Sequence, residues 1–430
     1  MHALQSLAVL TPQGNQFNAL DDSDDEDEDG GNYVIHVRTA MLEAKKGAIT
    51  ALGEMAAHTG ASFCPHLEES VKVLQKAATN WHPLIKTAVA EALPSMVAPS
   101  IAAYDEGEIK WKKGDINSPT PFSMPIVSAV LTVLITLMED DDKETVGKAC
   151  EGIQNVIELC GPHALVPVAN DCLQKTHDLL CKKAPCQQAG ELYGELPDDD
   201  DDHDEFMTSV CDLVGSFARV MGDHFTQYLP QFLPAICEYA KSSRPPSDRS
   251  MAMGCLSEIA QETDVSSYWE TIFFPAILAG LGDPDDNVKR NGAFCAGMCC
   301  ESLGESIGNK YPQLLQAISP LFSIDSSATE VSAAAVDNAA AAVARMIMAC
   351  PDHVPMSQVL PVLLKALPLK TDMTENETVY KCLFGLQQMN QPDLAANKDE
   401  LRGVFTKATS EGSNVDEDIQ GQIRLALQAL

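Results

Sequence analysis

Apolar residues recur three or four positions apart along most of this chain, and short polar turns interrupt them. The stretch from Phe274 to Met298 shows this pattern in two halves, which the turn Gly-Asp-Pro-Asp-Asp separates. We expect Gly282 to end the first helix in a left-handed conformation, Pro284 to prevent its continuation, and Asp286 to cap the second helix. The apolar faces consist of Phe274, Ile277, Leu278 and Leu281 in the first helix and Val288, Cys295, Ala296 and Cys299 in the second. Neither helix buries its stripe alone, so each is expected to pack against neighbours.

The same helix pair recurs along the chain. Segments with small central residues, typical of second helices, begin at Lys46, Lys86, Lys148, Ser209, Ser250, Asn291 and Asn338. The two intervals before Asn291 are each about 41 residues, within the range of roughly 40–47 for two-helix repeats. Several first helices carry proline near the start or middle, where it removes a backbone hydrogen bond and bends the helix. Strand signals are absent from the sequence.

These observations predict an all-α protein, an α-solenoid of HEAT repeats with about eight antiparallel helix pairs and one orphan N-terminal helix over about residues 36–59. We expect residues 1–32 to form a separate N-terminal segment and residues 33–430 a single solenoid. The intervals that run near 60 residues contain polar insertions, at about 105–122 and about 187–205.

The charge of the chain is strongly negative, with 62 acidic against 29 basic residues and a net charge of −33. Two acidic runs, Asp21–Asp29 and Asp198–Glu205, account for only part of it, because 47 acidic residues remain outside them. Nucleic acid is a poor partner for such a surface, and a basic protein is the natural complement. Both runs are expected to stay disordered, and to gather basic partners or to mask the binding surface. Their candidate residues are Asp24, Asp25, Glu26, Asp198, Asp199, Asp200, Asp201 and Asp202.

The sequence offers no positive case for an enzyme. It contains no phosphate-binding, dinucleotide-binding, serine-hydrolase or zinc-protease motif, and no paired Cys-x-x-Cys spacing for a structural metal. We therefore expect no cofactor and no metal. The fourteen cysteines are scattered, several of them within apolar helical stretches, as expected of a reduced intracellular protein, and no secretory signal is evident. The longest apolar run, Met124–Met138, is too short to span a bilayer, so no membrane is implied.

Three stretches resemble the late repeats of one family. The sequences Asp286–Met298 and Val336–Ile347 resemble late repeats of the importin-β superfamily, the β-karyopherins. The sequence Val359–Tyr380 resembles the importin-4 type, and the importin-5 type is the next most similar. The resemblance covers nearly all of the chain after Asn32 and corresponds to the C-terminal portion of these receptors. It implies a nuclear transport receptor that shuttles between cytoplasm and nucleus and recognises nuclear localisation signals. The resemblance implies basic cargo such as histones or ribosomal proteins. Ran GTPase would bind only through the N-terminal repeats of such a receptor, which the resemblance does not cover.

Second helices line the concave side of such a solenoid, so acidic residues on them are candidate cargo-binding residues. Glu151 and Asp212 share the register of Phe294, with Glu158 and Glu301 about two turns along that face. Asp337 has the register of Arg290, and Asn338 is expected either to bond the backbone of an extended peptide or to make a cap within its repeat or a bond between helices. The predicted site consists of Glu151, Glu158, Asp212, Glu301, Asp337 and Asn338.

Phe-Gly nucleoporins are a further implied partner, and two aromatic places are candidates for them. These are residues 59–67 and the pair Tyr268–Trp269, although core packing is the simpler interpretation of both. Two other functions fit the same sequence. One is a HEAT-repeat scaffold that organises a multi-protein complex through its ridge loops and convex face. The other is an acidic histone chaperone that acts through the Asp198–Glu205 run.

Overall fold

The computed structural model describes residues 39–188 and 200–430, and these residues divide between two compact units, Met1–Leu213 and Val214–Leu430. Neither described range contains a β-strand, which confirms the all-α prediction. The boundary lies within helix α11 (Asp200–Met221). The prediction of one continuous solenoid from residue 33 to residue 430 stays a prediction.

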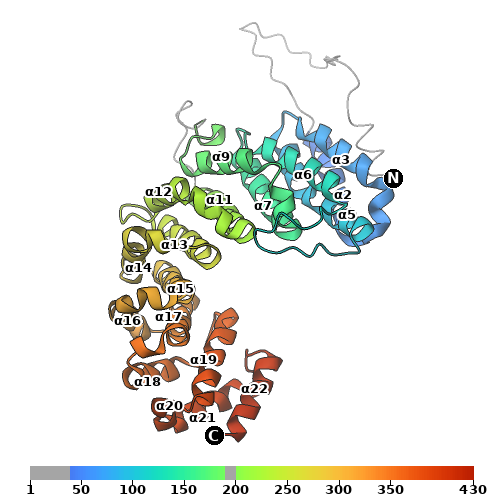
Figure 1. Cartoon of the computed structure of the whole chain (residues 1–430). Helices are drawn as coiled ribbons and strands as arrows, with labels where there is room; N and C mark the ends of the chain where they lie inside the picture. Colours follow the sequence, from blue (N-terminus) through green and yellow to red (C-terminus); the bar gives the residue numbers. More distant parts are fainter. Residues whose placement is uncertain (1–38, 189–199) are drawn as a thin grey trace, which may run out of the picture. The chain divides into compact units, whose positions relative to one another are not determined.

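The first unit is built from two rows of helices, seen in Figure 1. One row contains α2 (Thr39–Thr59), α4 (Pro83–Ala92) and α7 (Lys143–Cys160), in which each helix packs against the next. The other row contains α3 (Cys64–Ala78) and α6 (Met124–Leu137). The remaining helices of this unit are α5 (Val97–Tyr104), α8 (Pro162–Leu165) and α9 (Ala169–Leu180). Helix α2 is the predicted orphan helix.

The second unit repeats this arrangement. Its inner row is α13 (Pro246–Glu262), α15 (Asp286–Leu303), α17 (Glu330–Ala349) and α19 (Asn376–Gln388), each in contact with the next. The facing helices include α12 (Leu229–Tyr239), α14 (Phe274–Leu281), α16 (Tyr311–Ile318) and α18 (Met356–Ala366). The chain then continues through α20 (Pro392–Ala396), α21 (Lys398–Ala408) and α22 (Glu417–Gln428). Prolines lie inside α12 and α18, as the sequence predicts.

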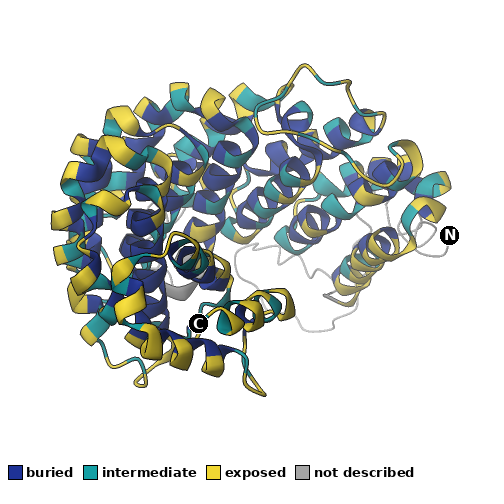
Figure 2. Ribbon diagram, turned by 60° about the horizontal axis from the view of Figure 1, so that its bottom comes forward, coloured by how far each residue is buried: buried dark blue, intermediate teal, exposed yellow. Residues whose placement is uncertain are grey.

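Within each unit the core lies between the two rows, where Figure 2 shows buried residues on the helix faces that meet. The predicted face of α15 is confirmed, since Val288, Cys295, Ala296 and Cys299 are all buried. Helix α17 is long and apolar enough to cross a membrane, but 89% of the relevant window is buried inside the protein. It therefore serves as the central core helix of the second unit.

The turn between α14 and α15 corrects two details of the sequence interpretation. Gly282 has φ −92° and is not left-handed, so the helix ends without the predicted cap conformation. Asp285, and not Asp286, caps α15, because its carboxylate accepts from the backbone N–H groups of Asn287 and Val288 at 2.9 and 3.1 Å. Asp286 instead bonds Lys289 and Ser332.

The second acidic run also differs from its prediction of disorder, because α11 begins at Asp200. The insertion at about 105–122 contains no helix, and Trp111 fixes it to the end of α7. The indole of Trp111 donates to the backbone oxygen of Glu158 at 3.1 Å and lies over Gly161, where a Cβ atom would be 2.3 Å from the ring.

Candidate functional site

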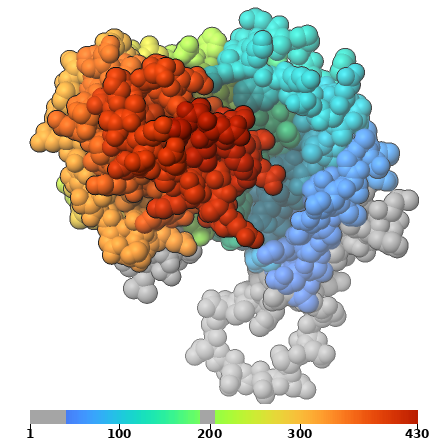
Figure 3. All heavy atoms as spheres, turned by 90° about the horizontal axis from the view of Figure 1, so that it is seen from below, coloured from blue at the N-terminus to red at the C-terminus, as the bar shows by residue number. Residues whose placement is uncertain are grey.

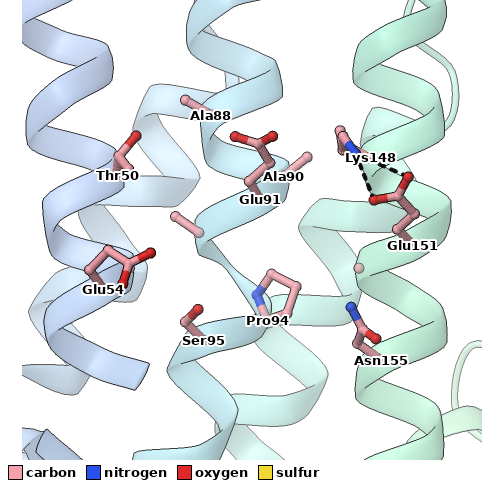
Figure 4. A pocket seen from close by; sticks show the side chains of 13 residues that line it. Thr50, Glu54, Ala88, Ala90, Glu91, Pro94, Ser95, Lys148, Glu151 and Asn155 are labelled. Atoms are coloured by element: carbon pink, nitrogen blue, oxygen red, sulfur yellow. Dashed lines mark hydrogen bonds and ion pairs between the residues drawn. The ribbon is translucent and has the colours of Figure 1, made fainter. Parts of the chain in front are cut away.

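A polar pocket of about 390 Å³ lies along the row of α2, α4 and α7 in the first unit, which we call the inner row of that unit. Helices α2, α4 and α7 form its walls, together with the short turn Pro94–Met96 (Figure 4). Each of the three helices contributes one carboxylate to the lining, namely Glu54, Glu91 and Glu151. We call this pocket and the surface next to it the inner acidic groove.

The helical period explains why these carboxylates face the groove. In α2, Ile49 and Leu52 are buried in the core while Glu54 is exposed. In α7, Cys150 and Ile153 are buried, and Glu151 between them is half-buried at the edge of the packed face. Because successive helices of the row are in direct contact, their polar edges are brought side by side.

The lining contains a single cation, Lys148, which is held within the carboxylate cluster. Its ammonium group lies 2.9 Å from Glu151 Oε2 (Figure 4). The hydrogen bond from Lys148 to Glu151 raises the pKa of the ammonium group, and the charges of Glu151, Glu91 and Glu144 contribute to this rise. The carboxylates of the groove therefore stabilise the charged form of Lys148.

Asp212 of α11 extends the cluster. Burial raises the pKa of its carboxyl group above the ordinary value of 3.8, and the neighbouring charges of Glu151 and Glu158 raise it further. Ser209, one turn earlier on α11, donates to Glu151 Oε1 at 3.1 Å. Glu151, Glu158 and Asp212 thus form one interacting group, in which a bound cation would relieve the repulsion.

Glu301 lies in the second unit, on α15. Its side chain is 61% exposed, and Glu301 Oε2 lies 3.1 Å from Arg345 Nε of α17. Arg345 is itself buried, forms an ion pair with Glu375 at 2.8 Å and donates a hydrogen bond to Glu375 Oε1 at 3.1 Å. Glu301 therefore already has a cationic partner from its own unit.

Asp337 corrects the sequence interpretation, and Asn338 takes the second of its two expected roles, because neither side chain presents a free group to a ligand. Asp337 is 1% exposed, and its carboxylate accepts the backbone N–H groups of Lys370, Thr371 and Asp372. Asn338 is 3% exposed and donates to Ala334 O and Asp372 Oδ2, both at 2.9 Å. Both side chains hold the loop between α18 and α19 in place.

The candidate residues of the two acidic runs fall into two groups. Asp24, Asp25, Glu26, Asp198 and Asp199 lie outside the described residues. Asp200, Asp201 and Asp202 belong to the first turn of α11. That these residues, or those of the groove, bind cargo stays a prediction.

In both aromatic candidates for Phe-Gly binding an aromatic ring belongs to the core, while Tyr268 is half-buried. Phe63 is 6% and Trp269 4% exposed, so neither ring is available to a ligand. A mainly apolar pocket of about 650 Å³ lies instead beside α16 and α18, with Phe322, Val359 and Val362 in its lining.

Glu54 and Glu91 are the groove residues that sequence reasoning missed. Both lie on segments that were recognised as second helices, and both face away from the apolar stripe. The signal was a carboxylate on the polar edge of each successive helix, but alignment on the small central residues did not bring these two into one register.

Comparison with known proteins assigns the fold first. In solved structures the chain is similar to Kap121p bound to the SUMO protease Ulp1p, with a TM-score of 0.70 and 16% identity over 91% of this chain and 36% of that one. Other solved forms of Kap121p are bound to RanGTP and to Nup53p. The described units thus have the fold of a karyopherin HEAT-repeat solenoid, which confirms the predicted fold class.

Sequence similarity gives the family. The chain is 26% identical to the probable importin subunit beta-4 of Schizosaccharomyces pombe over 447 residues, which cover 97% of this chain and 40% of that protein. It is 28% identical to importin-4 of Mus musculus, over 86% of this chain and 34% of that protein. No family model matches. These findings support membership of the importin-β superfamily, importin-4 type, and the chain spans about two fifths or less of these relatives.

Proposed function

We propose that this chain is the cargo-binding part of a nuclear transport receptor and that it binds basic proteins, such as histones or ribosomal proteins, in the inner acidic groove. The observation that carries the proposal is the placement of Glu54, Glu91 and Glu151 on three successive helices around one pocket. The similarity to importin-4 and importin subunit beta-4 supports the transport role. Such a receptor works in both cytoplasm and nucleus.

The groove suits an extended lysine-rich segment. Three carboxylates surround the pocket against one ammonium group, and Asp212 and Glu158 continue the negative surface along α11 and α7. Each exposed pair between a cargo lysine and a carboxylate contributes only about 0–1 kcal/mol, so affinity must come from several contacts at once. Because screening acts over about 8 Å at physiological ionic strength, binding should weaken steeply as salt is added.

Lys148 gives the groove an internal competitor. Its ammonium group already neutralises part of Glu151, as a cargo lysine would. A cargo segment that enters the pocket must therefore share Glu151 with Lys148 and Glu54 with His58, whose Nε2 lies 3.2 Å from Glu54 Oε2. Specificity then depends on the spacing of cations along the cargo, since carboxylates from separate helices must be matched together.

Phe-Gly nucleoporins and Ran are further proposed partners of the whole receptor. Solved structures of Kap121p bound to RanGTP and to Nup53p support this part of the proposal. In this chain, the apolar pocket beside α16 and α18 is the better candidate for a Phe-Gly segment, because Phe63 and Trp269 are buried.

The test is a binding titration with a labelled peptide of about ten residues that alternates lysine and glycine, at about 50 and about 500 mM salt. We expect Glu54→Gln/Glu91→Gln to weaken binding about five- to tenfold at low salt, because two ion pairs are lost. The matched control is Glu69→Gln/Glu108→Gln, which changes the net charge equally at exposed positions outside the pocket.

Equal effects of the two variants would show that only the total charge matters and would overturn the groove as the binding site. If the chain is instead a HEAT-repeat scaffold, we expect no preferential binding of the lysine peptide. An acidic chaperone predicts binding that depends on the Asp198–Glu205 run and is unaffected by the groove variant.

A further inference from the structure

Lys148 is placed differently from two other cations of the inner-row helices. Lys86 begins the corresponding segment of α4, and its ammonium group pairs with Asp140, which lies in the loop before α7. Arg249 of α13 pairs in the same way with Asp283, in the turn before α15. The side chains of these four residues are only 10% or 11% exposed. Both pairs are therefore buried links between successive repeats.

Lys148 instead pairs with a residue of its own helix. Its ammonium group lies 3.1 and 2.9 Å from the two carboxylate oxygens of Glu151, three positions along α7. The two side chains are 35% and 42% exposed, so water reaches the pair. Local pairs of this kind contribute little to stability, because water competes for both charges and the side chains lose freedom. The fold therefore depends little on this contact, and another ammonium group can take the place of Lys148.

Glu151 keeps a second donor when Lys148 leaves it. The hydroxyl group of Ser209, on α11, donates to Glu151 Oε1 at 3.1 Å, and Ser209 is only 8% exposed. The neighbouring helix thus orients the carboxylate independently of Lys148. An incoming ammonium group meets an acceptor that is already directed into the groove (Figure 4).

The side of the groove opposite Lys148 is open to solvent. Glu54 of α2 and Glu91 of α4 are exposed, and α2, at the blue end of the colour scale, lies on the surface of the first unit (Figure 3). A basic segment therefore meets Glu54 and Glu91 first and Lys148 only when it reaches Glu151. Deprotonation does not release Glu151 near neutral pH, because the hydrogen bond to Glu151 raises the pKa of Lys148 above its ordinary value of 10.5. Release requires a second cation.

We propose that Lys148 is an exchangeable counter-ion of the empty groove, which holds the place of a cargo lysine at Glu151 and is displaced when a basic segment binds. The proposal rests on the proposed function, because it concerns the regulation of the same groove. Exchange of one ammonium group for another leaves the number of ion pairs at Glu151 unchanged. The free energy of binding must then come from the other carboxylates, so segments with several lysines are selected over segments with one.

The first test compares two substitutions of Lys148 in the full chain, with the lysine peptide at about 50 mM salt. Lys148→Met removes the competing charge, and we expect it to strengthen binding about threefold to fivefold. Lys148→Arg should weaken binding about twofold, because a guanidinium group holds a carboxylate through two parallel hydrogen bonds and is harder to displace. The matched control is Lys72→Met, which removes one charge from an exposed local pair with Glu68 on α3, outside the pocket.

The second test follows Lys148 itself during binding. Limited acylation with an N-hydroxysuccinimide ester, read by mass spectrometry and scaled to Lys72, measures how free the amino group of Lys148 is. If exchange occurs, saturating peptide should raise the acylation of Lys148 about threefold, since its ammonium group leaves Glu151 and its pKa falls towards the ordinary value. A peptide that only covers the groove would lower the acylation instead.

Three results would each overturn exchange at Lys148. They are equal effects of Lys148→Met and Lys72→Met, a change in the same direction for Lys148→Met and Lys148→Arg, and lower acylation of Lys148 in the complex. Circular dichroism and thermal unfolding of each variant show that the fold is retained. If Glu54→Gln/Glu91→Gln weakens binding while the Lys148 variants leave it unchanged, the proposed function stands and only exchange fails. If the groove variant has no effect, the proposed function itself fails.

Discussion

At the residue scale, carboxylates in this protein play two different parts that depend on what surrounds them. The carboxylate of Asp337 lies in the core and accepts three backbone N–H groups of the loop between α18 and α19. Asp372 of the same loop bonds Asn338 and also Arg290 at 3.1 Å. These contacts connect three consecutive repeats of the second unit, so their role is structural.

We expect Asp337→Asn to lower the free energy of unfolding by about 1–3 kcal/mol, because its amide NH₂ group would face backbone donors and leave them unpaired. Chemical denaturation measures this change. Binding of the lysine peptide to the first unit should stay within twofold of the wild type. Weakened binding with unchanged stability would instead return Asp337 to the ligand-binding surface that its helical register suggests.

Asp212 is expected to behave in the opposite way to Asp337. Its carboxylate should lower stability and contribute to binding. Burial and the charges of Glu151 and Glu158 hold its pKa above the ordinary 3.8, so the unfolded chain loses this proton at a lower pH than the folded protein does. Ionisation of Asp212 therefore works against folding above its raised pKa, and the effect disappears below 3.8, where the group is protonated in both states.

Asp212→Asn should accordingly raise the unfolding temperature near neutral pH and change it little in strong acid. The same variant should weaken binding of the lysine peptide about threefold, because one contact is lost. Thermal unfolding across pH and a peptide titration make the comparison. A variant that loses stability at neutral pH would contradict the account of a repelling carboxylate cluster.

The residue scale is where sequence reasoning was weakest, and the reason is physical. A helical period gives the face on which a residue lies, but it does not tell which loop covers that face. Asp337 and Asn338 are covered by residues more than thirty positions later in the chain. For Glu151, Glu158 and Asp212 the helical register agrees with the structure, since their charges interact with one another, while their role in binding stays a prediction.

At the element scale, the sequence predicted the turn between α14 and α15 but assigned the N-cap of α15 to Asp286 instead of Asp285. Two adjacent aspartates offer equivalent carboxylates, and only the position at which the backbone enters helical geometry decides which one caps the helix. Asp285 has extended backbone angles and takes this role. Gly292 permits the two helices to approach closely, because a Cβ atom there would be 3.0 Å from the backbone of Gly280.

Asp285→Ala should lower the free energy of unfolding by about 1 kcal/mol through loss of the N-cap. Asp285→Asn keeps an oxygen acceptor and should lower the free energy of unfolding by only a few tenths of a kcal/mol. Chemical denaturation of the two variants separates capping from charge. Equal losses would show that the negative charge at the start of α15 matters more than the hydrogen bonds.

At the scale of the whole molecule, the fold class was predictable because its signal is repeated along the chain. Small residues recur in α2, α4, α7, α11, α13, α15 and α17, at intervals of about 40–47 residues or near 60 where an insertion intervenes, so an error in one repeat leaves the others in place. The acidic excess likewise predicted a basic partner before any geometry was known. The division into two compact units was not predictable, since its boundary falls within the unbroken helix α11.

We expect lysine side chains of a basic partner to lie against carboxylates of three successive helices in the first unit. Carbodiimide coupling of the lysine peptide, which joins a lysine amino group only to a carboxylate in contact with it, followed by mass spectrometry, tests this contact most directly. We expect cross-links at Glu54, Glu91 and Glu151 that disappear at high salt. Cross-links confined to the Asp21–Asp29 run, or as frequent at Glu69 as in the groove, would contradict it.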